Sequence, residues 1–191
     1  FIRFVNEESA KSNEIQQMLN LKRPDFRMRD VEILIRYYAF KFYLTTYSGS
    51  LQAFLDFTCS KLNEDWSNQC EDIFSELSEM KLAICAIRDI FGPENAFKKY
   101  KNSKYEDKYN RAVIDIMLYY LSQKDYRDVA LKKSSEVKAA FENCCMSNAQ
   151  FLASLETTTK SVSSVKCRFD TWGHVLNTTL GTNFATPIWP E

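Results

Sequence analysis

His174 is the first side chain to weigh for chemistry, because it is the only histidine in a chain of 191 residues. Asp170 lies one helical turn before it, so the two side chains would share a helix face and could form one edge of a metal site. A structural zinc site or a metal-dependent nuclease needs further clustered ligands. We therefore interpret His174 as a helix-surface residue beside a carboxylate, and we predict no metal ligands.

Adjacent cysteines at Cys144 and Cys145 are the second such pattern. Neighbouring residues on a helix point about 100° apart, so we predict one buried and one half-exposed thiol and no redox pair. The six cysteines of the chain are Cys59, Cys70, Cys85, Cys144, Cys145 and Cys167. Their spacing shows no small disulfide framework, and a chain of this length can be stable without crosslinks. We expect reduced cysteines and a cytoplasmic protein, although Asn177-Thr-Thr is formally a glycosylation acceptor.

Phosphate-binding loops and nucleophile motifs are missing from the sequence. Its four glycines are scattered and form neither a Gly-x-x-x-x-Gly-Lys nor a Gly-x-Gly-x-x-Gly loop. A serine or cysteine nucleophile would have only His174 to serve as its base. We therefore predict no catalytic residue and no cofactor in this chain taken alone.

Lysines alternate with tyrosines between residues 98 and 109, a pattern that suits contact with nucleic acid. Cations attract the phosphate backbone while aromatic rings stack on bases. The candidate contacts are Lys98, Lys99, Lys101, Lys104 and Lys108. The competing interpretation is a solvated loop compensated by Glu94, Glu106 and Asp107. Because 25 basic residues balance 25 acidic ones, any DNA binding by this chain should be weak.

The composition predicts an all-α fold. Only 4 Gly and 4 Pro interrupt long periodic segments, which favours helices over a many-stranded sheet. We expect an irregular bundle of about eight helices in one domain over residues 1–191, with a lead-in helix within 1–25 and an irregular tail over 182–191. The sequence shows neither a membrane-spanning run nor a signal peptide. Since it begins with Phe1 and not Met, we expect a piece of a longer protein.

Capping residues and breaks set the expected helix boundaries. Arg23, which precedes Pro24, marks a break after the first helix, while Gly92 and Gly181 end two later ones. The expected helices cover residues 6–20, 29–46, a segment from 51, 67–91, 109–122, 135–145, a segment from 147, and 161–180. We expect a short helix with an exposed connection over 94–107 and a polar connection over 124–135.

The helix that begins near residue 29 carries charged side chains beside a dense apolar surface. Arg29, Glu32 and Arg36 recur at spacings of three and four, so they lie on neighbouring positions of one face. We expect at least one of them to enter a partly buried ion pair.

Three separated segments of the chain resemble the helical half of the GmrSD-type restriction endonucleases, which are ParB/sulfiredoxin-like defence proteins. The first runs from Arg29-x-x-Glu32-x-x-x-Arg36 through Tyr37-Tyr-Ala-Phe40 to Tyr47-Ser-Gly-Ser-Leu51. The second leads from Phe91-Gly to Asn110-Arg-Ala-Val-Ile-Asp-Ile-Met117. The third is Thr159-x-Ser161-x-x-x-Val165-x-x-Arg168. Their order along the chain matches the order in the family.

This resemblance implies a function that the residues alone do not. Members of the family pair the helical half with an upstream nucleotide-hydrolysing half, often add an HNH-type nuclease, and restrict modified phage DNA. The family-motif residues Arg29, Glu32, Arg36, Asn110 and Arg168 would bridge helices or face that upstream domain. Nucleotide and a divalent metal would then belong to the full-length protein. The family's Asp-Gly-Gln-Gln-Arg run has no counterpart here, since Gln16-Gln17 has other neighbours, and the HNH histidines are missing too.

Two other functions stay open. One is a helical protein–protein interaction module with no nuclease context, and the other is a small secreted effector with disulfides. The coding sequence upstream of Phe1 would discriminate best among the three.

Overall fold

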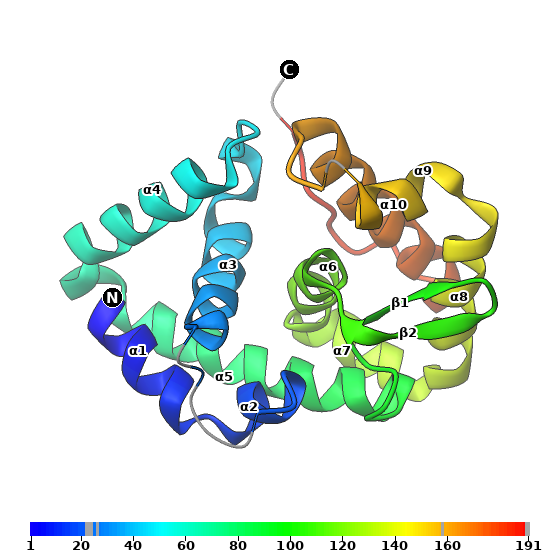
Figure 1. Cartoon of the computed structure of the whole chain (residues 1–191), viewed down its shortest axis with the longest axis horizontal. Helices are drawn as coiled ribbons and strands as arrows, with labels where there is room; N and C mark the ends of the chain where they lie inside the picture. The colour runs from blue at the N-terminus through cyan, green and yellow to red at the C-terminus, as the bar shows by residue number, and fades with distance from the viewer. Residues whose placement is uncertain (22–24, 26, 158, 190–191) are drawn as a thin grey trace.

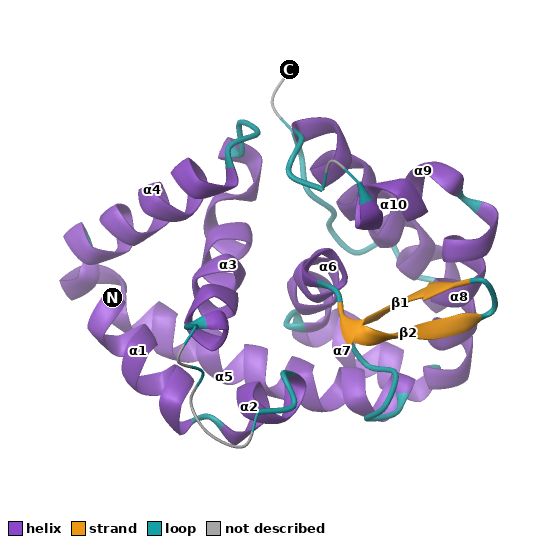
Figure 2. Cartoon of the chain, in the orientation of Figure 1, coloured by secondary structure: helices purple, strands orange, loops and turns teal. Residues whose placement is uncertain are grey.

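The computed structural model describes residues 1–21, 25, 27–157 and 159–189. Over these residues the fold is all-α apart from one small hairpin, which confirms the predicted class (Figure 2). The elements in chain order are α1 (Ile2–Lys11), α2 (Asn13–Met18), α3 (Arg29–Tyr43), the 3-10 turn η1 (Leu44–Thr46), α4 (Leu51–Glu64), α5 (Trp66–Phe91), β1 (Lys98–Lys101), β2 (Lys104–Tyr109), α6 (Arg111–Leu121), α7 (Lys124–Lys132), α8 (Ser134–Ser147), α9 (Ala149–Glu156) and α10 (Val162–Leu180).

The long helix α5 joins two groups of helices (Figure 1). On one side it contacts α2 and α4, and on the other it contacts α6, α7 and α8. The first group is completed by α3, which packs on α1 and α4, and the second by α10, which packs on α6, α8 and α9. Helix α3 also packs on α6, so the two groups meet directly at these two helices.

Helix α5 follows its predicted periodicity. Ile73, Leu77, Met80 and Ile84 are buried along one stripe, which ties the helix to the core. It ends at Gly92, whose φ of +83° an L side chain rarely adopts. It begins at Trp66, one residue before the predicted start at 67, with Asp65 as its N-cap.

Helices α4, α6 and α10 begin at side-chain caps, and the starts of α4 and α10 match the prediction, whereas α6 begins at Arg111 and not at 109. Ser50 Oγ accepts from the backbone N–H of Ala53 at 3.3 Å, and Ser161 Oγ accepts from that of Ser164 at 3.2 Å. Asn110 caps α6 in the same way. Such caps fix where a helix starts and therefore where its first side chains lie.

A β-hairpin stands where we expected a short helix and an exposed connection over 94–107, so that expectation was wrong. Strands β1 and β2 pair antiparallel, and Tyr100 lies opposite Tyr105 with ring centroids 5.0 Å apart. Asn102 and Ser103 have φ of 52° and 59° at the turn, the left-handed conformation that a tight hairpin requires. The cross-strand tyrosine pair and the turn outweigh the helix propensity of the lysines.

Other boundaries also differ from the prediction. The first helix begins at Ile2 and not at residue 6, and it is split at Ser12, whose hydroxyl caps α2 through the N–H of Ile15. Helix α7 replaces the expected polar connection, because Tyr126 and Ala130 are buried one turn apart. Helix α9 is capped by Asn148, not by Ser147. The predicted break at Arg23 lies outside the described residues.

Beyond α10 the chain from 182 to 189 has no regular structure and is tied back to the helix. Asn177 Oδ1 accepts from the backbone N–H of Phe184 at 3.0 Å. In the part of the chain that the structure describes, no helix is both long and apolar enough to cross a membrane.

Candidate functional site

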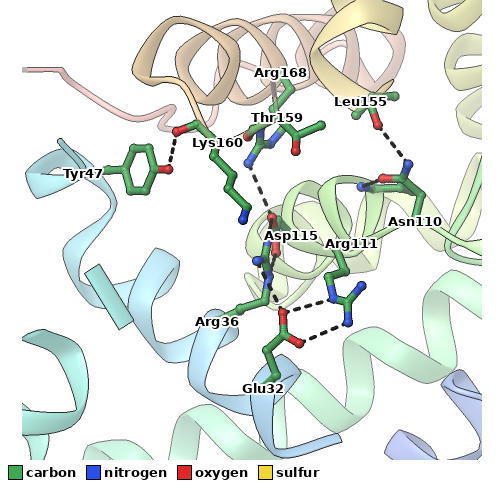
Figure 3. Close-up of polar contacts among 11 residues, drawn as sticks. Glu32, Arg36, Tyr47, Asn110, Arg111, Asp115, Leu155, Thr159, Lys160 and Arg168 are labelled. Atoms are coloured by element: carbon green, nitrogen blue, oxygen red, sulfur yellow. Dashed lines mark hydrogen bonds and ion pairs between the residues drawn. The ribbon is translucent and has the colours of Figure 1, made fainter. Parts of the chain in front are cut away.

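A polar cleft of about 440 Å³ lies where α3 faces α6 and the connection between α9 and α10, and we call it the central cleft. Figure 3 shows its principal polar residues, which come from both helix groups. The residues that line it are Glu32, Arg36, Phe40, Tyr47, Leu51, Tyr109, Asn110, Arg111, Ala112, Leu155, Glu156, Thr159, Lys160 and Arg168.

Two arginines share one carboxylate at the base of this cleft. Arg36 Nε and Nη2 on α3 donate to the two oxygens of Asp115 on α6, at 3.0 and 2.5 Å. Arg168 Nη2 on α10 lies 3.5 Å from Asp115 Oδ2. We call these three residues the buried Arg–Asp–Arg cluster, since no member side chain is more than 7% exposed. The cluster joins α3, α6 and α10.

The two guanidinium groups differ in how well the carboxylate compensates them. Burial works against the charge on Arg36, but the close Asp115 carboxylate outweighs it and raises the pKa of Arg36 above its ordinary value. Burial lowers the pKa of Arg168 below its ordinary value. The Asp115 carboxylate is farther from Arg168 than from Arg36 and offsets only part of this effect, and the positive charge of Arg36 lowers the pKa of Arg168 further. Arg168 Nε is also buried without a hydrogen-bond partner among the described residues. Arg168 is therefore the less compensated cation.

A second ion pair lies nearer the mouth of the cleft. Arg111, the first residue of α6, donates through Nη2 to Glu32 Oε2 on α3 at 3.1 Å, and its Nε lies 3.0 Å from Glu32 Oε1. Glu32 Oε1 is also 3.8 Å from Arg36 Nη1, which connects the pair to the buried cluster. Both Glu32 and Arg111 are partly exposed, so this pair is accessible to solvent and ligands.

Asn110 fixes the start of α6 and its contact with α9. Its Oδ1 accepts from the backbone N–H of Val113 at 3.1 Å, and its Nδ2 donates to the carbonyl of Leu155 at 2.9 Å. One side chain thus caps one helix and satisfies the end of another.

The connection between α9 and α10 closes the opposite wall. Arg168 Nη1 donates to the carbonyl of Thr159 at 2.7 Å, and the Tyr47 hydroxyl donates to the carbonyl of Lys160. Because the Lys160 backbone is held in this way, its side chain extends from the wall toward Asp115 (Figure 3).

The structure brings four of the five family-motif residues to this cleft: Glu32, Arg36, Asn110 and Arg168. The fifth, Arg29, lies in the first turn of α3, pairs with Asp25 and lines a separate, wider groove.

Sequence reasoning missed Asp115, Arg111 and Lys160. Asp115 carried a signal, since it is the one carboxylate in the otherwise apolar helix α6. Such an isolated acid on a buried helix requires a partner.

The predicted nucleic-acid contacts divide into two sets. Lys99 is buried, 2.8 Å from Glu106 and 2.6 Å from Glu156, and Lys101 lies 2.7 Å from Glu156. These carboxylates compensate both lysines. The other three predicted contacts, Lys98, Lys104 and Lys108, have no ion pair in the described part of the chain.

The cysteine and histidine patterns also have definite positions. Cys144 and Cys145 are both buried, so the expectation of one half-exposed thiol was wrong, and burial raises their pKa values to about 11 and about 12. All six cysteines are described, and all are free. Asp170 accepts from Trp189 Nε1 at 2.7 Å on the helix face that carries the exposed His174. Among the described residues no cluster of metal ligands is present.

Comparisons of the chain with protein-family models, with curated proteins and with solved structures find no match.

Proposed function

We propose that the chain is the helical body of a GmrSD-like protein that restricts modified phage DNA, supporting an upstream half that hydrolyses nucleotide and cleaves DNA. The observation that carries this proposal is that three separated segments of the chain meet at one cleft. Arg36, Asn110 and Arg168 come from the three segments that resemble the family, and all three line the central cleft. Segments this far apart in sequence need not meet, so their meeting supports a shared role.

The contacts at the cleft support a structural role for the motif residues. Arg36 joins α3 to α6 through Asp115, and Asn110 joins α6 to α9 through Leu155. Each of these contacts therefore joins two elements at the cleft, which suits a body that presents a rigid face to a partner domain.

The coding sequence upstream of Phe1 tests the proposal most directly. We expect an Asp-Gly-Gln-Gln-Arg motif within a ParB/sulfiredoxin-like domain. The purified chain alone, incubated with GTP, ATP and plasmid DNA in the presence of divalent metals, should hydrolyse none of them, whereas the joined protein should hydrolyse nucleotide. An upstream region without that domain, or turnover by the chain alone that one substitution in it removes, would contradict the proposal.

The alternative of a protein–protein interaction module is supported by exposed apolar side chains. Phe57 on α4 and Phe74 and Leu82 on α5 are 41%, 49% and 52% exposed. Exposed apolar residues mark interaction surfaces only where they form a patch. This function is the one to pursue if the upstream sequence lacks the expected motif.

A further inference from the structure

The central cleft carries more positive charge than its carboxylates compensate. Four cationic side chains, Arg36, Arg111, Lys160 and Arg168, line it. They face two carboxylates, Glu32 and Asp115. The third carboxylate of the cleft wall, Glu156, is already held by Lys99 and Lys101. The excess of positive charge lies inside a concave, partly desolvated site, where it attracts anions more strongly than on an open surface.

Unused hydrogen-bond donors point to the same kind of ligand. Arg168 Nε is buried without a partner in the described part of the chain, and the side chain is 2% exposed. Lys160 Nζ makes no ion pair or side-chain hydrogen bond with any of the described residues. The N–H groups of Arg111 and Ala112, at the start of the eleven-residue helix α6, have no carbonyl within their own helix. Arg111, Ala112, Lys160 and Arg168 all line the same cleft, at the positive end of the α6 dipole.

The size and walls of the cleft indicate which anion it can hold. Its volume of about 440 Å³ falls within the ~300–1,000 Å³ of small-ligand pockets. The guanidinium groups at its base are too deeply buried for the backbone phosphates of a DNA duplex. Of the aromatic residues that line it, Phe40 and Tyr47 are 2% and 5% exposed and only Tyr109 is partly exposed, so the phosphates of a ligand and not a flat base carry the fit.

We propose that the central cleft binds the triphosphate group of a nucleotide, with Arg111 and Lys160 as its accessible contacts and Arg168 at its base. Guanidinium groups bind phosphate oxygens in pairs, and lysine supplies a compact charge that can follow a flexible chain of phosphates. The proposal stands on the cleft alone and goes beyond the proposed function, in which nucleotide belongs to the upstream half. It also replaces our expectation from sequence that this chain binds no cofactor.

Calorimetric titration of the full chain with GTP, ATP, inorganic triphosphate and inorganic phosphate tests the proposal. We expect the two nucleotides and inorganic triphosphate to bind, with Kd below about 1 mM at low salt, and single phosphate to bind more weakly. The change of Lys160 to Ala should weaken triphosphate binding by about tenfold, and the Arg111→Ala/Lys160→Ala pair by more. Because Arg36 and Arg168 hold the fold together, they are left unchanged.

A substitution that should strengthen triphosphate binding, and not weaken it, makes the test specific. Glu32→Gln removes the carboxylate that competes for Arg111, so it should tighten triphosphate binding. Arg3→Ala and Lys11→Ala, both exposed on α1, are the matched controls and should leave it unchanged. Thermal melts check that each variant is folded. If the Arg111 variant unfolds, Lys160→Ala and Glu32→Gln still decide the outcome.

Three results would overturn the proposal: no nucleotide binding by the folded chain, equal binding of phosphate and triphosphate, or triphosphate binding that ignores both Lys160→Ala and Glu32→Gln. None of these depends on the upstream coding sequence. The proposed function can therefore fail while this inference holds, and this inference can fail while the proposed function holds.

Discussion

The central cleft and the β1–β2 hairpin are both rich in cations, yet they compensate that charge differently. In the hairpin, the buried Lys99 contacts two carboxylates, and Lys101 shares one of them. In the cleft, Arg36 and Arg168 must share Asp115. The number of carboxylates within reach, and not the number of cations in the sequence, decides which region is left positive.

The two regions also differ in what their charges do for the fold. A buried charge that loses its partner destabilises a protein far more than an exposed one does. The cluster around Asp115 is buried and joins three helices, whereas Lys99 is the one buried lysine of the hairpin, and Lys104 and Lys108 are exposed. Substitutions should therefore affect stability strongly in the cleft and weakly in the hairpin.

The largest effect is expected for Asp115→Asn. The change leaves two buried guanidinium groups side by side with only the more distant carboxylate of Glu32 near Arg36, and should cost about 3–5 kcal/mol of unfolding free energy. Urea unfolding measures the loss. Asp72→Asn, an exposed position on α5, is the control and should stay within about 0.5 kcal/mol. A loss below about 1 kcal/mol for Asp115→Asn would place this cluster in the same class as the hairpin's surface charges.

A smaller loss is expected for Arg36→Ala, because Arg168 remains beside Asp115 after the change. We expect about 3 kcal/mol, the lower end of the range for breaking a buried pair. Leu34→Ala on the same helix, which removes a fully buried side chain, should cost about 2–5 kcal/mol and provides the scale. If thermal melts show a loss for Leu34→Ala and none for Arg36→Ala, Arg36 acts as a contact to a partner and not as a structural bridge.

The carboxylate between the two regions predicts a pH effect. Hydrogen bonds from Lys101 and Lys99 lower the pKa of Glu156 below its ordinary value. A carboxyl group whose pKa is lower in the folded state stabilises the fold above its unfolded pKa, about 4.3, and loses that contribution as the pH falls through the folded pKa. Glu156→Gln should therefore be less stable than wild type at neutral pH and approach it in acid.

Melting temperatures recorded from about pH 3 to pH 7 measure this difference. The exposed Glu71→Gln on α5 serves as the control and should follow the wild-type profile. If the difference in melting temperature between Glu156→Gln and wild type stays constant down to the lowest pH, Glu156 acts by packing and not by its charge.

Local signals in the sequence predicted much of the fold. Ser50 and Ser161 cap helices through their own side chains, and Gly92 and Gly181 end helices by adopting positive φ. Each of these depends on neighbours within a few residues, so a single sequence contains the required information.

Features that depend on distant partners could not be predicted in the same way. The hairpin depends on the pairing of Tyr100 with Tyr105, and the cleft on interactions such as that of Arg36 with Asp115, 79 residues apart. Spacing within Arg29, Glu32 and Arg36 indicated a buried pair on α3, but nothing in that spacing identified Asp115 as the partner. The resemblance to a family selected four cleft residues without showing that they meet.

The smallest expected effect concerns DNA binding, and it should differ between two sets of hairpin lysines. Carboxylates already compensate Lys99 and Lys101, so only Lys98, Lys104 and Lys108 remain to bind phosphate. Changing those three to Gln should reduce the salt dependence of any DNA binding, lowering the slope of log K against log salt by about 0.9 for each phosphate that is no longer neutralised. Fluorescence anisotropy with a labelled duplex at several salt concentrations measures that slope.

The Lys99→Gln/Lys101→Gln pair is the comparison and should change the slope less. DNA binding that persists at ~200 mM salt and ignores all five lysines would remove the hairpin from consideration and point to Arg29 and Arg88, which line the wider groove.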